Sequence, residues 1–230
     1  MMEILCELQS PPVEWKTTLA PSPDLLLRAI LRALAYADIF DYPLTAAEIH
    51  RYLEVPASLE RVQEVLQDGR LSPTRFRRCD GFFTLPGREA IVETRRRRAV
   101  LSAQQWPRAH RYGRWIAALP FVRMVAVTGS LAVDNVEPGT DIDYLIVTEA
   151  GRLWLCRAMV IGLVRLAALW GDEVCPNYFI TENALHFAER TLYTAHELAQ
   201  MVPLAGAATY HRIRRLNAWA ATFLPNAAGS

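Results

Sequence analysis

The sequence lacks several patterns that would assign it to a class at once. Its four cysteines, Cys6, Cys79, Cys156 and Cys175, are far apart and include no Cys-x-x-Cys pair. This spacing argues against a structural zinc site and against a disulfide framework, so reduced thiols are expected. Neither a Gly-x-x-x-x-Gly-Lys loop nor a Gly-x-Ser-x-Gly elbow occurs, which excludes the enzyme classes that depend on those two motifs.

Long apolar runs free of charge are also missing. The longest apolar stretch, Leu153 to Trp170, approaches membrane-spanning length but contains Arg157 and Arg165. Charges inside a bilayer are costly, so a buried core helix is expected there instead. The first twenty residues carry three glutamates and lack a basic start followed by an apolar run. No secretory signal is therefore predicted, and a cytoplasmic protein without a membrane partner is expected.

Charge is balanced overall but unevenly distributed. The 230 residues are 52% hydrophobic, enough for a substantial core, and the net charge is +1. Residues 70–114, however, hold 12 basic and 3 acidic side chains, a net of 12 − 3 = +9, and every basic one is arginine. Guanidinium groups bind phosphate oxygens bidentately, so this block suits a phosphate-bearing partner. The alternative is a solvated helix face.

The amino-terminal part predicts a small helical domain with a hairpin. Residues 1–23 are rich in proline and predict an irregular lead-in. Three segments with helical apolar spacing follow, the second opening with Thr45 and Glu48 in a capping-box pattern and the third ending at Gly69. Two strand-like arms then flank Asp80-Gly81, which favours a tight turn. Three helices and a hairpin over residues 24–87 are the layout of a winged helix.

The partner of this domain stays open between two alternatives. A winged helix that binds DNA lays its third helix in the major groove, but the third helix here is mostly acidic. The more cationic elements are the hairpin, with Arg75, Arg77 and Arg78, and the run Arg95–Arg98. These arginines could contact nucleic acid, and the other alternative is a packing or protein-contact role.

The rest of the chain predicts a helical connector and then a mixed sheet. Residues 88–119 form the connector, in which Pro107 is expected to bend or divide the helix. Four consecutive residues point in all directions around a helix, so Arg95–Arg98 cannot all face one ligand. Residues 120–230 alternate β-branched apolar runs with helical ones, and helices are expected over 182–200 and 207–223. The fold class is therefore α+β, with a small mixed sheet flanked by helices.

Two aspartates open one of the predicted strands, in the stretch "VTGSLAVDNVEPGTDIDYLIVT". Residues two apart in a strand share a face, so Asp141 and Asp143 project together while Ile142 faces the other side. Two such carboxylates repel each other unless a cation neutralises them. A hard ion that prefers oxygen ligands, Mg²⁺ or Mn²⁺, is the expected cofactor.

A glycine and a serine end the preceding predicted strand. Gly129 lets the backbone approach a ligand closely, and Ser130 adds a hydroxyl donor. A short helix is expected to begin near Leu131, and a helix N-terminus attracts anions. A polyphosphate fits beside the metal in such a place, which is the arrangement that phosphoryl or nucleotidyl transfer requires.

These residues carry a family resemblance. The stretch from Gly129 to Val147 resembles the motif of the DNA polymerase β-type nucleotidyltransferase superfamily, in which Gly-Ser precedes an Asp-x-Asp pair. The stretch "ALAYADIFDYPLTAAEIHRYL" is similar to the winged-helix portion found ahead of such domains in some bacterial proteins. The resemblance implies that Asp141 and Asp143 ligate divalent ions. It also implies that Gly129, Ser130 and Thr140 bind a nucleoside triphosphate, whose nucleotidyl group passes to an acceptor hydroxyl.

The chain departs from the family pattern at two places. Many small members have Arg-Gly where this chain has Val133 and Asp134, so one phosphate contact is missing or supplied elsewhere. Active members commonly place a third carboxylate on the next core strand, where this chain has Asn177, an amide that cannot act as a base near neutral pH. Glu173 or Glu182 could substitute, although neither stands where the pattern expects.

Two functions follow as hypotheses. The first is a metal-dependent nucleotidyltransferase whose acceptor is unknown. The second is a non-catalytic regulator that senses a nucleotide and contacts DNA or protein through the winged helix.

Overall fold

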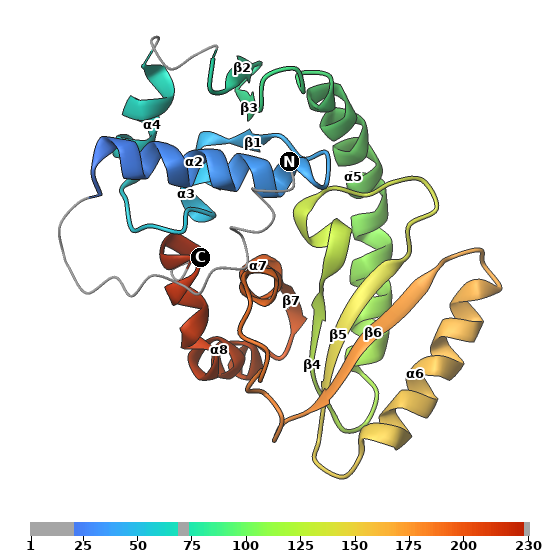
Figure 1. Cartoon of the computed structure of the whole chain (residues 1–230). Coiled ribbons are helices and arrows are strands. Elements are labelled where there is room, and N and C mark those ends of the chain that lie inside the picture. Colours follow the sequence, from blue (N-terminus) through green and yellow to red (C-terminus); the bar gives the residue numbers. More distant parts are fainter. Residues whose placement is uncertain (1–20, 69–73, 228–230) are drawn as a thin grey trace. The chain divides into compact units, whose positions relative to one another are not determined.

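The structure of the protein is a computed structural model that describes residues 21–68 and 74–227 (Figure 1). It divides into two compact units. Unit 1 comprises Met1–Arg95, Glu189–Ala199 and Trp219–Ser230, and unit 2 comprises Arg96–Ala188 and Gln200–Ala218. Helices and strands occur in both, so the predicted α+β class is confirmed. The predicted lead-in falls almost wholly outside the described residues, and so does Gly69, the predicted end of the third helix.

The helices of unit 1 begin where the sequence supplies capping residues. Helix α2 (Pro23–Asp38) has Ser22 as its N-cap and proline at its first position, where a missing N–H costs nothing. Helix α3 (Ala46–Arg51) begins with the predicted capping box, in which the side chains of Thr45 and Glu48 each accept the other residue's backbone N–H. Helix α4 (Leu59–Gln67) is capped by Ser58. The apolar faces of the three helices meet in one core.

A small three-stranded sheet completes this unit. Strands β2 (Arg77–Cys79) and β3 (Phe82–Thr84) pair as the predicted hairpin, and the two-residue strand β1 (Leu44–Thr45) adds to the other side of β3. Asp80 and Gly81 both have positive φ, which the tightest hairpin turns require. The hairpin turn was therefore correctly predicted from the Asp-Gly dipeptide.

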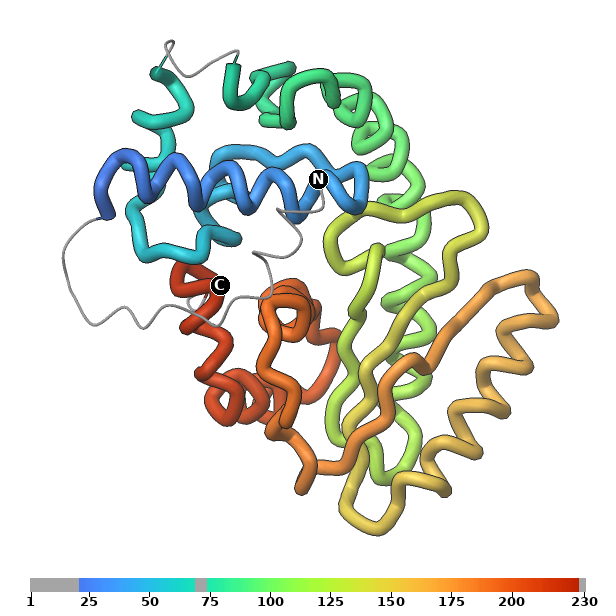
Figure 2. The backbone as a smooth tube through the Cα atoms, viewed as in Figure 1, coloured from blue at the N-terminus to red at the C-terminus, as the bar shows by residue number. Residues whose placement is uncertain are grey.

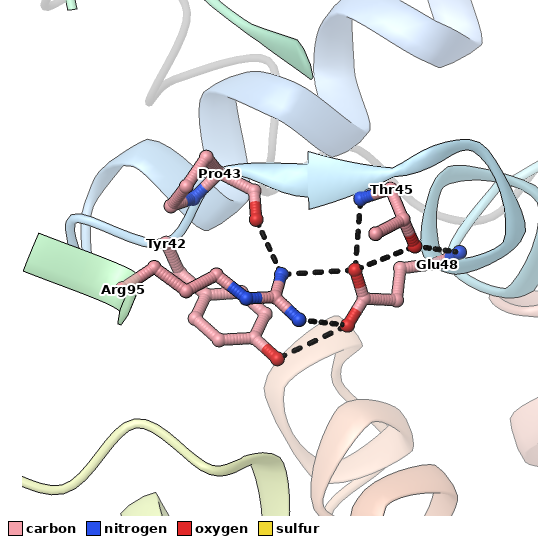
Figure 3. A network of polar contacts seen from close by, with 5 residues as sticks. All are labelled: Tyr42, Pro43, Thr45, Glu48 and Arg95. Carbon is pink, nitrogen blue, oxygen red and sulfur yellow. Dashed lines mark hydrogen bonds and ion pairs between the residues drawn. The ribbon is translucent and has the colours of Figure 1, made fainter. Parts of the chain in front are cut away.

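Arg95 joins the start of the longest helix to the capping box of unit 1 (Figure 3). Its guanidinium donates to both oxygens of Glu48 over 2.6 and 2.9 Å and to the carbonyl of Pro43. It also lies 4.1 Å from the ring centre of Tyr42, whose hydroxyl donates to the same carboxylate. Burial alone would raise the pKa of Glu48, but the hydrogen bonds and charge of Arg95 outweigh it and lower that pKa. This arginine is therefore a structural part of unit 1.

His196 is buried in unit 1 between aromatic rings. It lies on helix α7 (Leu192–Gln200), stacks on Tyr36 at 4.1 Å between ring centres, and contacts the ring of Tyr52 at 4.9 Å. Burial lowers its pKa to about 3, because the site does not solvate a positive charge. Within the described part of the chain its Nδ1 has no hydrogen-bond partner. His196 is thus a neutral packing residue.

Unit 2 is built on a four-stranded sheet with the order β6-β5-β4-β7. Its strands are β4 (Val122–Val127), β5 (Ile142–Thr148), β6 (Val174–Thr181) and β7 (Val202–Ala205). Strands β5 and β6 are parallel, and Figure 2 shows the chain crossing between them through helix α6 (Leu153–Ala168). The other two pairs are antiparallel. The first three strands were predicted, and β7 was not, because it is short and contains Pro203, which only an edge strand tolerates well.

Helices cover one face of this sheet. Helix α5 (Ile91–Ala117) runs unbroken through Pro107, which therefore does not divide it. Its carboxyl-terminal half and α6 pack on Ile142, Tyr144 and Ile146, the inward-pointing residues of β5. The alternate residues of β5, which include Asp143, consequently project from the opposite face.

Helix α6 corrects one sequence prediction. A buried core helix was expected, yet only one stripe, Cys156, Val160 and Ala167, is buried. Trp154 is 78% exposed, and Leu169, the residue after the helix, is 80% exposed. Helix-to-sheet packing covers a single side, so apolar residues on the other side face solvent in the described chain. In the described part of the chain, no helix is both long and apolar enough to cross a membrane.

The carboxyl-terminal helices are shorter than predicted. The expected helix over residues 182–200 begins only at Leu192, and the one expected over 207–223 is α8 (Ala207–Leu216), followed by a separate 3₁₀ turn at Ala218–Thr222. The buried side chain of Asn217 partly explains why no helix forms near residues 185–187. Its side chain donates to the carbonyl of Leu185 over 2.7 Å and accepts the N–H of Phe187 over 2.8 Å. These backbone groups are satisfied without a helix.

Candidate functional site

The two predicted aspartates lie at the start of β5 in unit 2. Asp141 immediately precedes the strand and Asp143 is its second residue, while Ile142 between them is buried in the core. The oxygen atoms of the two side chains lie within 4.8 Å of each other. The structure therefore brings the two carboxylates together on the sheet face opposite the core helices.

The structure adds Cys175, a residue that the sequence reasoning did not place here. Its sulfur lies within 4.8 Å of an oxygen atom of each carboxylate. The cause is strand register, since Cys175 of β6 stands directly opposite Asp143 of the parallel β5. No local sequence pattern links residues 32 apart, so only the pairing of β5 with β6 could have revealed this neighbour.

An irregularity in β6 places Asn177 near the same carboxylate. Cys175 pairs with Asp143 and Tyr178 with Leu145, so β6 has one residue more than β5 between these two pairs. Such a bulge changes the direction of side chains along the strand. The amide of Asn177 lowers the pKa of Asp143, so it lies close to that carboxyl group. Asn177 is the residue matched to the third family carboxylate, and it brings an amide.

Gly129 lies directly against Asp143. A Cβ atom at this glycine would overlap Oδ2 of Asp143 and would lie 3.2 Å from its Cγ. Gly129 also has φ of +66°, a conformation that residues with a side chain seldom adopt. The glycine is therefore needed both for its backbone conformation and for the close approach of the carboxylate to the turn.

Two hydroxyl groups near this glycine are buried without a partner in the described chain. Thr128 is 4% exposed, and its Oγ1 has no hydrogen-bond partner among the described residues; the same holds for Oγ of Ser130. The N–H of Thr128 donates to the carbonyl of Asp143, and continuing the antiparallel register from the pair Val127–Tyr144 sets these two residues opposite each other. Opposite residues share a face, so Thr128 projects beside Asp143.

Thr140 is engaged elsewhere. Its hydroxyl accepts the N–H of Glu137 over 3.3 Å, and its carbonyl accepts from the side chain of Gln105 over 2.9 Å. The hydrogen bond between the hydroxyl of Thr140 and the N–H of Glu137 closes the loop that precedes Asp141. The hydroxyl of Thr140 thus stabilises the conformation of the loop that leads into Asp141.

The electrostatics of the cluster favour the binding of a cation. Burial, and next the charge of Asp141, raise the pKa of Asp143, while hydrogen bonds from Cys175 and Asn177 oppose the rise. Burial, together with hydrogen bonding to the carboxylates and their charge, raises the pKa of the Cys175 thiol to about 12. Three acidic groups that each disfavour the charge of the others are stabilised by a divalent ion.

The two glutamates that could have replaced the third carboxylate do not join the cluster. Glu173 precedes β6 and contributes its backbone carbonyl to Ile142, while its side chain is exposed. Glu182 follows the opposite end of β6, where it pairs with Arg123 over 3.7 Å. Among the described residues, the third member of the group is therefore a thiol.

The departure from the family pattern at Val133 and Asp134 also has a structural correlate. Asp134 ends the 3₁₀ turn η1 (Gly129–Val133) with φ of +54°, a position where glycine is common and aspartate is tolerated. Its carboxylate accepts the indole N–H of Trp106 over 2.8 Å. Asp134 thus anchors the loop to α5.

Part of the arginine block is used by the fold. Arg98 contacts Asn135 and Glu137 within unit 2, and Arg95 serves unit 1 as described above. In the hairpin, Arg77 pairs with Glu89 over 3.1 Å. Arg75, Arg78, Arg96 and Arg97 are exposed. The arginines that could meet a phosphate-bearing partner are thus fewer than the sequence count indicated.

The residues present fit a divalent ion. Two carboxylates and one thiol supply three ligand atoms within 4.8 Å of one another, and Gly129 lets the backbone turn lie directly against Asp143. The unpartnered hydroxyl of Thr128 adds a polar group on the same face.

Comparisons of the chain with protein-family models, with curated proteins and with solved structures give no match.

Proposed function

We propose that the protein is a divalent-metal-dependent nucleotidyltransferase, which moves a nucleoside monophosphate from a nucleoside triphosphate to an acceptor hydroxyl and releases pyrophosphate. The observation that carries the proposal is the joint position of Asp141, Asp143 and Gly129. Two carboxylates have oxygen atoms within 4.8 Å of each other, and because the glycine has no side chain, one of them lies directly against the turn.

In this proposal each residue has a separate task. Asp141 and Asp143 would hold the ion, which supplies charge screening for the triphosphate and for the leaving pyrophosphate. Gly129 would let the backbone approach the phosphates, and Ser130 would donate its buried hydroxyl to them. Asn177, whose amide lowers the pKa of Asp143, would help to keep that carboxylate in its charged form.

Unit 1 would serve as the recognition module. Its three helices and hairpin agree with the winged-helix layout. Exposed Arg75 and Arg78, beside and on the hairpin, would be its contacts if the acceptor is a nucleic acid. In that case the affinity for the nucleic acid falls steeply with salt concentration. Replacing Arg75 and Arg78 together then reduces the slope of log affinity against log salt concentration by about two.

The test of the main proposal is transfer of label from α-³²P nucleoside triphosphates with Mg²⁺ or Mn²⁺. The acceptors offered are protein, RNA ends and sugar hydroxyls, and pyrophosphate is measured in parallel. We expect transfer by the native chain and none by Asp141→Asn, whereas Glu189→Gln, an exposed carboxylate outside the cluster, transfers normally. If pyrophosphate release is absent across all nucleotides and metals, the transferase proposal fails.

One observation favours a second function, a nucleotide-sensing regulator. Asn177 and Cys175 stand where a third carboxylate would complete the catalytic set, and neither is a base at neutral pH in this environment. This hypothesis expects a nucleotide to raise the melting temperature in the presence of Mn²⁺ without pyrophosphate release. Loss of that shift in Asp141→Asn would tie it to the same site.

A further inference from the structure

We propose that Cys175 is the third protein ligand of the ion held by Asp141 and Asp143, and that this site selects a thiophilic dication of the Zn²⁺ or Co²⁺ class over Mg²⁺. The inference deepens the proposed function, because it concerns the identity of the ion at the same site. A thiol in the set changes the metal preference, since Mg²⁺ takes oxygen ligands and thiolate suits softer ions.

The geometry of the three ligand atoms supports the assignment. Ligand bonds of about 2.0–2.3 Å allow two atoms on one ion to be at most about 4.6 Å apart. The oxygens of Asp141 and Asp143 and the sulfur of Cys175 already lie within 4.8 Å of one another. Small side-chain rotations would therefore bring all three onto one ion without moving the strands.

The strands hold the thiol in this place. Cys175 is directly opposite Asp143, and the bulge begins immediately after it at Pro176. The sheet therefore fixes both the pairing partner and the direction of the side chain. The sulfur of Cys175 therefore lies within 4.8 Å of an oxygen atom of each carboxylate.

A second, independent observation points to a ligand at this place. Thr128 is 4% exposed, stands opposite Asp143 on the same sheet face, and its Oγ1 has no hydrogen-bond partner among the described residues. Buried hydroxyl groups nearly always have a partner. A water molecule or phosphate oxygen on the ion would supply one.

Binding would release one proton. The thiol loses its proton to solvent as the sulfur–metal bond forms, and no oxidant or reductant is involved. A thiolate bound to Co²⁺ gives a sulfur-to-metal charge-transfer band in the near ultraviolet, which carboxylate ligands do not give. The band therefore reports the sulfur ligand without any assay of activity.

The experiment uses the full chain, freed of metal by chelation and titrated with Co²⁺ under reducing conditions. We expect a charge-transfer band that saturates at one ion per chain and disappears when Zn²⁺ is added. Cys175→Ser should lose the band and weaken Zn²⁺ binding at least about tenfold. Cys79→Ser, a thiol variant in unit 1, should keep both, and circular dichroism confirms that each variant is folded.

A further variant tests the selectivity. Cys175→Asp makes the set all carboxylate, and we expect its preference to move toward Mg²⁺ by at least about tenfold. The inference is overturned if the native chain shows no charge-transfer band, or if Cys175→Ser binds Co²⁺ and Zn²⁺ as the native chain does. A charge-transfer band without nucleotidyl transfer would support the metal site and contradict the proposed transferase function. Mg²⁺-dependent transfer that is unchanged in Cys175→Ser would support the transferase function and contradict the role of Cys175 as a metal ligand.

Discussion

Gly129 and Asp143 are so close that a single added methyl group at the glycine would overlap the carboxylate. The two residues belong to different elements, the turn after β4 and the start of β5. Their contact is the point at which the predicted phosphate turn and the predicted metal ligand meet, so it offers the sharpest mutational test of the site.

Gly129→Ala should remove metal and nucleotide binding. Alanine at this position would collide with Oδ2 of Asp143 and would also be strained at φ of +66°. Gly139→Ala is the matched control, because Gly139 has φ of +79° and open space around its position. Both variants should lose about 1 kcal/mol from backbone strain. Isothermal titration with Mn²⁺ and nucleotide separates them, and equal binding by the two variants would contradict the site.

Asp141→Asn should stabilise the metal-free protein. The carboxylates of Asp141 and Asp143 lie within 4.8 Å of each other, and neutralising one removes a repulsion of about 1 kcal/mol. Urea unfolding in the presence of a chelator measures the gain, with Glu189→Gln as the control. Added metal should reverse the order, because only the native chain gains stability from it. Destabilisation of the chelated variant would show that the pair is not repulsive.

Stability should depend on pH through His196. Its pKa is near 6.5 in the unfolded chain and is lowered to about 3 by burial in the folded one. Between these values only the unfolded state binds the proton, so stability is complete above about pH 6.5 and falls as the pH falls. From pH 8 to pH 5 the loss is about 2 kcal/mol.

The variant that tests this dependence is His196→Phe. Phenylalanine keeps the stacking with Tyr36 and Tyr52 but has no proton to bind. Urea unfolding at several pH values should give a flatter profile than that of the native chain. His211→Gln, at an exposed histidine, should retain the native slope. An equally steep profile for His196→Phe would assign the dependence to another group.

Arg95→Lys should weaken unit 1 although the charge is kept. Lysine cannot donate to both oxygens of Glu48 and to Pro43 at once, nor stack on Tyr42 as a planar group. We expect a loss of about 1–3 kcal/mol in thermal unfolding. Arg75→Lys, at an exposed hairpin arginine, should change stability by less than about 0.5 kcal/mol. Similar effects of the two variants would show that the network contributes little.

Local sequence rules predicted local structure well. The capping box at Thr45 and Glu48, the Asp80-Gly81 turn and the shared face of Asp141 and Asp143 each depend on residues at most three apart. For such features the sequence contains all the relevant information, because neighbouring backbone and side-chain atoms decide the conformation.

Features set by distant pairing were missed. Cys175 reaches the site only through the register of β6 against β5, and Asn217 holds backbone groups near Leu185 that sequence periodicity assigned to a helix. The burial of α6 was overestimated because composition does not tell how many sides of a helix are covered. These outcomes depend on tertiary neighbours, which a single sequence does not list.

The bulge in β6 has a consequence for how this stretch could change by insertion or deletion. Because β6 carries one residue more than β5 between Cys175 and Tyr178, the number of residues there sets which side chains reach the aspartates. Replacing Pro176 with another residue leaves that number intact. Deleting it would remove the bulge, leave Cys175 opposite Asp143 and set Asn177 opposite Tyr144, which turns the amide to the other face of the sheet.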